Sequence, residues 1–194
     1  MKLLRISAEN PDKRLVSHAA KAILEGNIII YPTDTVYGLG CSISSEDSVK
    51  RIFEIKGRSP AKPLSIAFPD VESAKKYAFL EAKDEEYIKK NINEPLTFIV
   101  RKKELVPDYV TAGMETVGIR IPDNKIVKEM LLSAKIPVIT TSANISGEKA
   151  PAAFQEINKK ILDKVDLAID SGTCRAKVPS KIVNLLTGKV LRGA

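Results

Sequence analysis

Three short polar segments carry the side chains best suited to chemistry. In the first, Thr33, Asp34 and Thr35 follow the apolar run 27–31. Polar side chains after the C-terminal end of a buried strand are typical of ligand sites in α/β folds. A tight hairpin would instead favour Asn-Gly or Asp-Gly in its turn. The segment therefore indicates a binding site more than a turn.

The second segment contains two cations separated by a glycine. Lys56 and Arg58 flank Gly57 at the end of a helical pattern, and Lys62 follows shortly after. Cations at a helix C-terminus complement the helix dipole, which is one explanation. The other is that the glycine lets both cations leave the helix surface and bind one phosphate. The sequence leaves both explanations open.

The third segment, TTSANISG at residues 140–147, follows an apolar strand pattern. Its four hydroxyl groups and one asparagine form a dense cluster of small donors and acceptors, although a simple turn would use the same residue types. Ser142 and Asn144 are two positions apart, so in an extended segment both side chains face the same side. We expect both to face a ligand.

Several common catalytic classes are excluded. His18 is the single histidine and lies in a helical pattern, so a serine triad or a multi-histidine metal site is not expected. Cys41 and Cys174 form no CxxC pair, and a chain of this size needs no disulfide framework. Phosphate-binding loops of the GxxxxGK[ST] type are also absent. We therefore predict no metal site built by protein ligands.

The composition indicates a chain with an anionic partner. It has 194 residues, 44% of them hydrophobic, and a formal net charge of +7, which favours a polyanion or a phosphate-rich substrate. No apolar run reaches the ~20 residues that span a bilayer, and the first residues lack the apolar core of a signal peptide. We expect a cytoplasmic monomer without membrane contact.

Helical and strand patterns alternate along the chain. Helices are predicted at 12–25, 44–57, 71–78, 84–92, 124–134 and 154–162, and strands at 27–31, 63–68, 95–102, 115–122, 136–142, 166–170, 180–186 and 189–192. Ser44 and Asp47 have capping-box spacing for the second helix. Two consecutive strands, 95–102 and 115–122, break strict alternation, so we predict one α/β domain over residues 1–194 with a twisted, mixed sheet.

The order of the motifs resembles the YrdC-like family of threonylcarbamoyl-AMP synthases. The matching segments are YPTDTVYGLG, IFEIKGR with KPL, PLTFIV, VTAGMETVGIRIPD, TTSANISG and LRGA, spread over residues 10–194. The family signatures KxR and SxN correspond to Lys56/Arg58 and Ser142/Asn144. The resemblance implies a YrdC-like twisted mixed sheet with flanking helices around a deep positive cavity.

The resemblance also implies a reaction. The family combines L-threonine, bicarbonate or CO2, and ATP into threonylcarbamoyl-adenylate and pyrophosphate, with Mg²⁺ on the ATP. Other proteins then transfer the threonylcarbamoyl group to adenosine 37 of tRNAs that read ANN codons. A carbamate oxygen of the substrate attacks the α-phosphorus, so the protein supplies positioning and charge neutralisation and needs no nucleophile of its own.

Site residues follow from the same resemblance. The implied catalytic residues are Lys56, Arg58, Ser142 and Asn144, which also bind ATP together with Lys62, Thr116 and Arg192. The implied threonine-binding residues are Thr35, Arg120, Thr140 and Ser180. Arg120 is a candidate clamp for the threonine carboxylate, with a structural cation as the alternative.

Some positions depart from the family pattern. Ala67 stands where longer relatives carry a histidine, which leaves the amino-acid specificity open. LRGA lacks the proline of the usual LRPGA ending, and Lys181 replaces the threonine that usually follows Ser180. Longer relatives continue into a linker and a second domain, so the sequence corresponds to the single-domain form.

Two other functions remain as alternatives. An RNA-binding module of the same fold, for double-stranded RNA or tRNA, would use the positive surface, although only 5% of residues are aromatic and base stacking is therefore limited. A carbamoyl-transferring relative of the hydrogenase-maturation type is the third possibility, but such domains belong to longer chains with zinc-finger cysteines.

Overall fold

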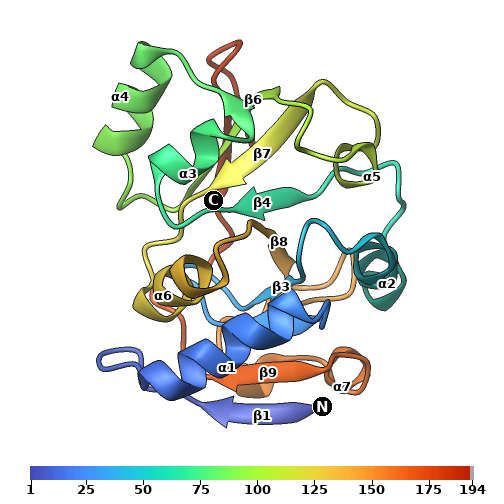
Figure 1. Ribbon diagram of the computed structural model, residues 1–194. Coiled ribbons are helices and arrows are strands. Elements are labelled where there is room, and N and C mark those ends of the chain that lie inside the picture. Colours follow the sequence, from blue (N-terminus) through green and yellow to red (C-terminus); the bar gives the residue numbers. More distant parts are fainter. Residues whose placement is uncertain (193–194) are drawn as a thin grey trace.

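The computed structural model describes the backbone of residues 1–192 and the side chains of residues 1–191. Its strands form one mixed sheet in the order β1-β9-β2-β3-β8-β4-β7-β6-β10-β11, with β5 paired to β6 (Figure 1). The strands are β1 (Lys2–Arg5), β2 (Ile29–Tyr31), β3 (Gly38–Gly40), β4 (Ser65–Ala67), β5 (Ala78–Phe79), β6 (Leu96–Lys102), β7 (Thr116–Arg120), β8 (Val138–Ser142), β9 (Leu167–Asp170), β10 (Lys181–Asn184) and β11 (Val190–Arg192).

The helices pack around this sheet. They are α1 (Lys13–Leu24), α2 (Glu46–Lys56), α3 (Val71–Lys75), α4 (Ala82–Lys90), α5 (Asp108–Thr111), α6 (Lys125–Ala134), the 3-10 turn η1 (Phe154–Glu156) and α7 (Lys159–Leu162). Helices α1 and α6 lie together over the half of the sheet that contains β2 and β9, whereas α3 and α4 lie at the opposite end (Figure 1). This arrangement agrees with the predicted mixed α/β fold.

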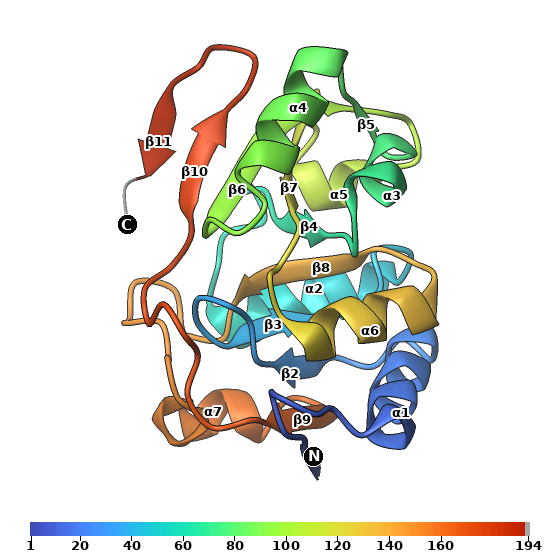
Figure 2. The same cartoon turned by 90° about the vertical axis from the view of Figure 1, so that its left-hand side faces the viewer.

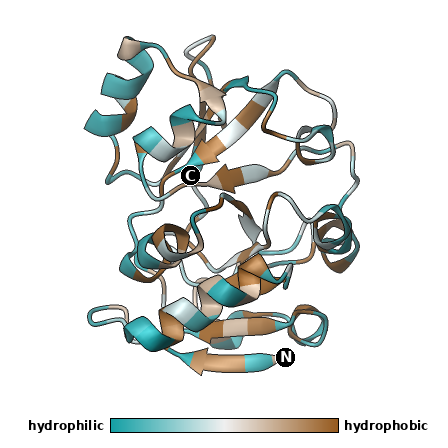
Figure 3. Ribbon diagram, in the orientation of Figure 1, coloured by the Kyte–Doolittle hydropathy of each residue, from teal (hydrophilic) through white to brown (hydrophobic). Residues whose placement is uncertain are grey.

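Amphipathic helices create two hydrophobic clusters. The larger contains residues of α2, β4, β6 and β7, and the smaller joins α1 and α6 to residues of β1, β2 and β9. In α1, Asp12 caps the first turn by accepting from the backbone N–H groups of Arg14 and Leu15. The apolar residues of these helices face the sheet and polar residues face outward (Figure 3). Burial of these apolar faces fixes the helices to the sheet.

The start of α2 differs from the prediction. The N-cap residue is Ser45, not Ser44, and its side chain makes no capping hydrogen bond. Its hydroxyl instead donates to Ser48 Oγ at 2.8 Å, and the Ser48 hydroxyl donates to the carbonyl of Gly26 after α1, so these side-chain bonds replace the capping box. At the other end Gly57 adopts φ 56°, a left-handed conformation that glycine reaches without strain.

The segment after β2 is both a hairpin connection and part of a cavity wall. Strands β2 and β3 pair antiparallel, with Ile29 opposite Gly40 and Tyr31 opposite Gly38. The sequence favours a binding site over a tight turn here, because the Asn-Gly or Asp-Gly of a tight turn is absent. A loop of six residues, 32–37, connects the strands and needs no such turn.

Other elements depart from the sequence pattern. The predicted helix 154–162 is interrupted at Ile157, whose φ and ψ of −70° and 126° are extended. The pattern also missed β1, β3, β5 and α5, which are each only two to four residues long. Periodicity over two to four residues carries too little signal to identify them.

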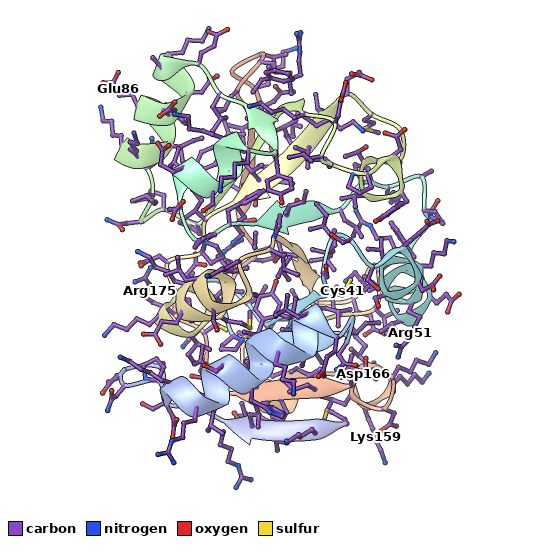
Figure 4. The ribbon with its side chains drawn as sticks, in the orientation of Figure 1. Cys41, Arg51, Glu86, Lys159, Asp166 and Arg175 are labelled. Atoms are coloured by element: carbon purple, nitrogen blue, oxygen red, sulfur yellow. The ribbon has the colours of Figure 1, made fainter. Side chains whose placement is uncertain are left out.

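Long-range contacts join the ends of the chain to the body of the molecule. After α7 and β9, the chain runs past the central strands to β10, which pairs parallel with β6 (Figure 2). Arg51 of α2 forms an ion pair of 3.4 Å with Asp166, just before β9 (Figure 4). None of the helices among the described residues is long and apolar enough to cross a membrane.

Candidate active site

A cavity of about 430 Å³ opens over the centre of the sheet. Strand register places one residue from each of five adjacent strands in a row along it: Thr140, Ser65, Gly118, Ile99 and Asn184. Among the described residues, no aspartate or glutamate side chain lines this cavity, whereas two arginines do. The volume is within the range of small-ligand sites, and the lining favours an anionic ligand.

The structure brings most of the predicted site residues to this cavity. Those that line it are Thr35, Arg58, Thr116, Arg120, Thr140, Ser142 and Ser180. Lys56 and Asn144 lie behind the wall, and Lys62 is exposed on the loop that follows Arg58. Arg192 ends β11, and its side chain lies outside the described residues.

At one end of the cavity, Arg120 is held by two side chains from the loop after β2. Its Nη2 donates to Asp34 Oδ1 at 2.7 Å and to Thr35 Oγ1 at 2.8 Å. The Thr33 hydroxyl lies 2.9 Å from that of Thr35 and donates to the carbonyl of Val36 at 2.7 Å. The polar residues of the first segment therefore form one buried network around the guanidinium.

Elsewhere along the wall, Arg58 lies half-buried on the loop after α2. It donates to the carbonyls of Pro63 at 2.9 Å and Lys62 at 3.4 Å. These bonds hold the loop from Gly57 to Pro63 in a compact turn and keep the guanidinium at the cavity surface. This position favours the phosphate-binding explanation for Arg58 over helix-dipole complementarity alone.

Lys56 occupies a different position from Arg58. It is 2% exposed, and its ammonium donates to the backbone carbonyls of Ser142 and Asn144 and to Asn144 Oδ1. An ammonium has three donors, and here each has an acceptor. Lys56 therefore supports the loop after β8 from behind, next to Ser142 at the cavity.

Asn144 does not face the cavity alongside Ser142 as expected. The strand β8 ends at Ser142, so the alternation of an extended segment stops before Asn144. The Asn144 amide donates to the carbonyls of Ile145 at 3.0 Å and Glu148 at 2.7 Å. Its oxygen accepts from Lys56 at 3.4 Å. The side chain thus closes the turn and ties it to Lys56.

The sequence analysis did not predict several residues that line the cavity. Thr97 of β6 lies 2.9 Å, hydroxyl to hydroxyl, from Ser180, and this pair joins the segment before β10 to the sheet. Ser65, Gly118 and Asn184 also line the cavity. No local motif marks them, because their position depends on strand register across the sheet.

The charge of Lys56 predicts a pH dependence. Burial, with a smaller effect of the Arg58 charge, lowers the pKa of Lys56 from 10.5 to about 8. Above pH 8 the amine loses one of its three donors, so turnover should fall through that range. A Lys56→Arg variant stays protonated, and its remaining turnover, measured from pH 6 to 10, should lack this decline.

Stability should change in the opposite direction. Between pH 8 and 10.5 the unfolded chain binds the Lys56 proton more strongly than the folded protein, so this group's contribution to stability rises with pH. Thermal unfolding over the same range separates the two effects. A decline in turnover that follows a decline in melting temperature would contradict the assignment to Lys56.

The fold is mixed α/β with a central cavity whose lining favours small anionic ligands, and comparisons identify the family of the protein. A family model described as "Telomere recombination" (Sua5/YciO/YrdC) matches residues 21–194. The chain therefore belongs to the Sua5/YciO/YrdC family, in agreement with the resemblance seen in its motifs.

Relatives and solved structures support this assignment over nearly the whole chain. A putative threonylcarbamoyl-AMP synthase of Methanocaldococcus jannaschii is 38% identical over 98% of this chain and 90% of its own length. The structure of Pyrococcus abyssi Sua5 complexed with L-threonine has a TM-score of 0.92 and 32% identity, covering 99% of this chain and 57% of that one. E. coli YciO has a TM-score of 0.90 and 27% identity, covering 99% and 95%.

Proposed function

We propose that this protein synthesises L-threonylcarbamoyl-adenylate and pyrophosphate from L-threonine, bicarbonate or CO2, and ATP. One observation carries the proposal: a single cavity presents Arg58 on one part of its wall and the Arg120–Thr35 network on another. A reaction between a nucleoside triphosphate and an amino acid needs an anion site for each. Relatives named threonylcarbamoyl-AMP synthase, including that of Psychromonas ingrahamii at 31% identity over 91% of this chain, support the same activity.

The residues supply positioning and charge neutralisation. Arg120 holds the threonine carboxylate, and the hydroxyls of Thr35, Thr140 and Ser180 surround that end of the substrate. Arg58 and Lys62 meet the triphosphate. The threonine amine adds CO2 to form a carbamate, one carbamate oxygen attacks the α-phosphorus, and the bond to the β-phosphate oxygen breaks to release pyrophosphate. No step requires a protein nucleophile.

Thr116 and Ser142 complete the nucleotide side of the cavity. Both line it, and their hydroxyls can donate to phosphate oxygens or to the carbamoyl group. Lys56 and Asn144 act through Ser142, because both bind the loop on which it sits. Arg192 remains a proposed ATP ligand by family resemblance.

Mg²⁺ enters this proposal as part of the ATP substrate. Among the described residues there is no cluster of three histidine, cysteine, aspartate or glutamate side chains that could hold a metal ion. The cavity hydroxyls and arginines fit a nucleotide whose phosphates already carry the cation. The metal then neutralises charge on the phosphates.

The direct test is product formation. Pyrophosphate release should require L-threonine, bicarbonate and ATP together, and mass spectrometry should detect threonylcarbamoyl-adenylate. A mixture of amino acids in the same assay would establish the specificity that Ala67 leaves open. Pyrophosphate release that is independent of any amino acid would contradict the proposal.

A substitution at Arg58 tests the phosphate site. Each charge-assisted hydrogen bond contributes ~1.5–3 kcal/mol, so Arg58→Ala should weaken ATP binding by roughly ten- to a hundredfold. Its half-buried position predicts little change in melting temperature. Calorimetric titration with ATP measures the first effect and thermal unfolding the second. An unstable variant that binds ATP normally would make Arg58 a structural residue.

The two alternatives lack comparable support. The similar proteins named above favour the synthase over an RNA-binding module, so direct contact with tRNA or double-stranded RNA remains a prediction. The structure of T. kodakarensis HypF matches with a TM-score of 0.78 at 23% identity, which shows a shared fold alone. Transfer of the product to tRNA by other proteins, the monomeric state and the cytoplasmic location also remain predictions.

A further inference from the structure

Asp34 lies directly behind Arg120 and outside the cavity that Arg120 lines. Both side chains are buried, with 5% of Asp34 and 7% of Arg120 exposed. Arg120 faces the cavity, whereas Asp34 borders a separate open pocket with Asp123 and Arg175. Asp34 therefore acts on a ligand in the cavity through its contact with Arg120 and through its charge, not by direct contact.

The contacts of Arg120 leave two of its three guanidinium nitrogens available to a ligand. Nη2 makes both of the observed hydrogen bonds, to Asp34 and Thr35. Within the described residues, Nε and Nη1 have no hydrogen-bond acceptor. Because the guanidinium is planar and rigid, fixing Nη2 fixes the direction of the other donors. Both paired-donor edges of a guanidinium include Nη2, whose two hydrogens are already used, so a ligand carboxylate accepts one hydrogen bond, from Nε or from Nη1.

The backbone holds Asp34 firmly in this position. Its carbonyl accepts from the N–H of Ala176 at 2.9 Å, and the carbonyl of Thr35 accepts from the N–H of Lys177 at 3.0 Å. These bonds tie the loop to the segment that precedes Ser180. The carboxylate is thus a fixed negative charge 2.7 Å from the arginine.

We propose that Asp34 is a positioning and specificity-determining residue that makes the Arg120 end of the cavity selective for a single carboxylate over a phosphate chain. The inference rests on the proposed function. A buried, unneutralised arginine would attract a polyphosphate more strongly than a carboxylate, since the attraction grows with ligand charge. The fixed Asp34 charge cancels most of this difference, so a singly charged carboxylate is no longer at a disadvantage against a phosphate chain. It thereby keeps ATP and pyrophosphate out of the amino-acid end.

Two substitutions separate the effect of the Asp34 charge from the effect of its position beside Arg120. Asp34→Asn keeps an oxygen acceptor for Arg120 and removes the charge. With the nucleotide end filled by a non-hydrolysable ATP analogue, this variant should bind inorganic pyrophosphate at least about tenfold more tightly than wild type, about 1.4 kcal/mol. L-threonine should displace that pyrophosphate. Asp34→Glu keeps the charge and shifts Arg120, so it should raise KM for L-threonine about tenfold with kcat and KM for ATP little changed.

The exposed pair of Arg175 and Asp123 provides a matched control. Arg175 Nη2 also lies 2.7 Å from a carboxylate oxygen, Asp123 Oδ2, but the Arg175 side chain is 65% exposed and that of Asp123 is 42% exposed. Arg175 lies at the surface beside α6 (Figure 4). Asp123→Asn removes the same charge from the protein and should change neither pyrophosphate binding nor KM for L-threonine. An equal gain in pyrophosphate affinity in this variant would show a general charge effect and overturn the proposal.

A double variant keeps the proposal testable if Asp34→Asn does not fold. Asp34→Asn/Arg120→Gln removes both charges and leaves no unpaired buried ion. It should fold and bind pyrophosphate no more tightly than wild type, which would place the effect of Asp34 at Arg120. Tighter binding in the double variant, or unchanged ligand preference in a folded Asp34→Asn protein, would overturn the proposal. Binding is measured without turnover, so absence of synthase activity in wild type would contradict only the proposed function.

Discussion

Asn144→Ala is expected to lower turnover by ~10²-fold, the size of effect seen when a group that organises the transition state is lost. The variant removes two donors to the carbonyls of Ile145 and Glu148 and one acceptor of Lys56. Ser142 then no longer has a fixed position at the cavity. Leaving buried partners unsatisfied costs ~1–3 kcal/mol, so the melting temperature should also fall by about 2–4 °C per kcal/mol. Steady-state pyrophosphate release and thermal unfolding measure the two effects.

Two comparison variants separate a loss of turnover from a loss of stability. Asn158→Ala removes an asparagine that also closes a turn, accepting from Lys160 N at 3.0 Å, but that lies on the surface; turnover should stay normal. Ser142→Ala should lower turnover without a loss of stability, because its hydroxyl lines the cavity. Normal turnover in the folded fraction of Asn144→Ala would remove Asn144 from the functional site and leave it a purely structural residue.

Gly40→Ala should cause the largest loss of stability. A Cβ at this position would overlap the carbonyl oxygen of Ile139 and lie 3.0 Å from Val138 Cγ1. The obstacle is backbone, so β3 and β8 must separate to admit the methyl group. Overpacking costs typically ~1–3 kcal/mol and more where the backbone must move. We expect at least about 3 kcal/mol, or a decrease of roughly 6–12 °C in melting temperature.

Gly118→Ala is the matched comparison within the same sheet. There the Cβ would approach the Ser65 hydroxyl at 2.5 Å, the end of a side chain that can rotate away. Stability should fall less than in Gly40→Ala, and Ser65→Ala in the same chain should restore it. A Gly40→Ala protein as stable as wild type would show that the two strands separate more easily than their pairing indicates.

The sequence by itself determined the fold class, the family and the three polar segments of the site. Helices α1 and α6 are ten or more residues long and have regular apolar faces. This periodicity is visible in the sequence, and burial of the apolar faces holds the helices in place. Lys56/Arg58 and Ser142/Asn144 were found from local spacing and motif resemblance. The type and order of these residues are properties of the chain alone.

Only the tertiary structure decided which of these side chains face the ligand. Lys56 and Arg58 are equivalent in the motif, yet one is 2% exposed behind the loop after β8 and the other lines the cavity. Ser142 and Asn144 also lie in different places: Ser142 lines the cavity and Asn144 does not, because β8 ends at Ser142. The pairing of Asp34 with Arg120 spans 86 residues, and the row from Thr140 to Asn184 depends on the register of five strands. Register and long-range contact are set by packing of the whole sheet, so no local pattern encodes them.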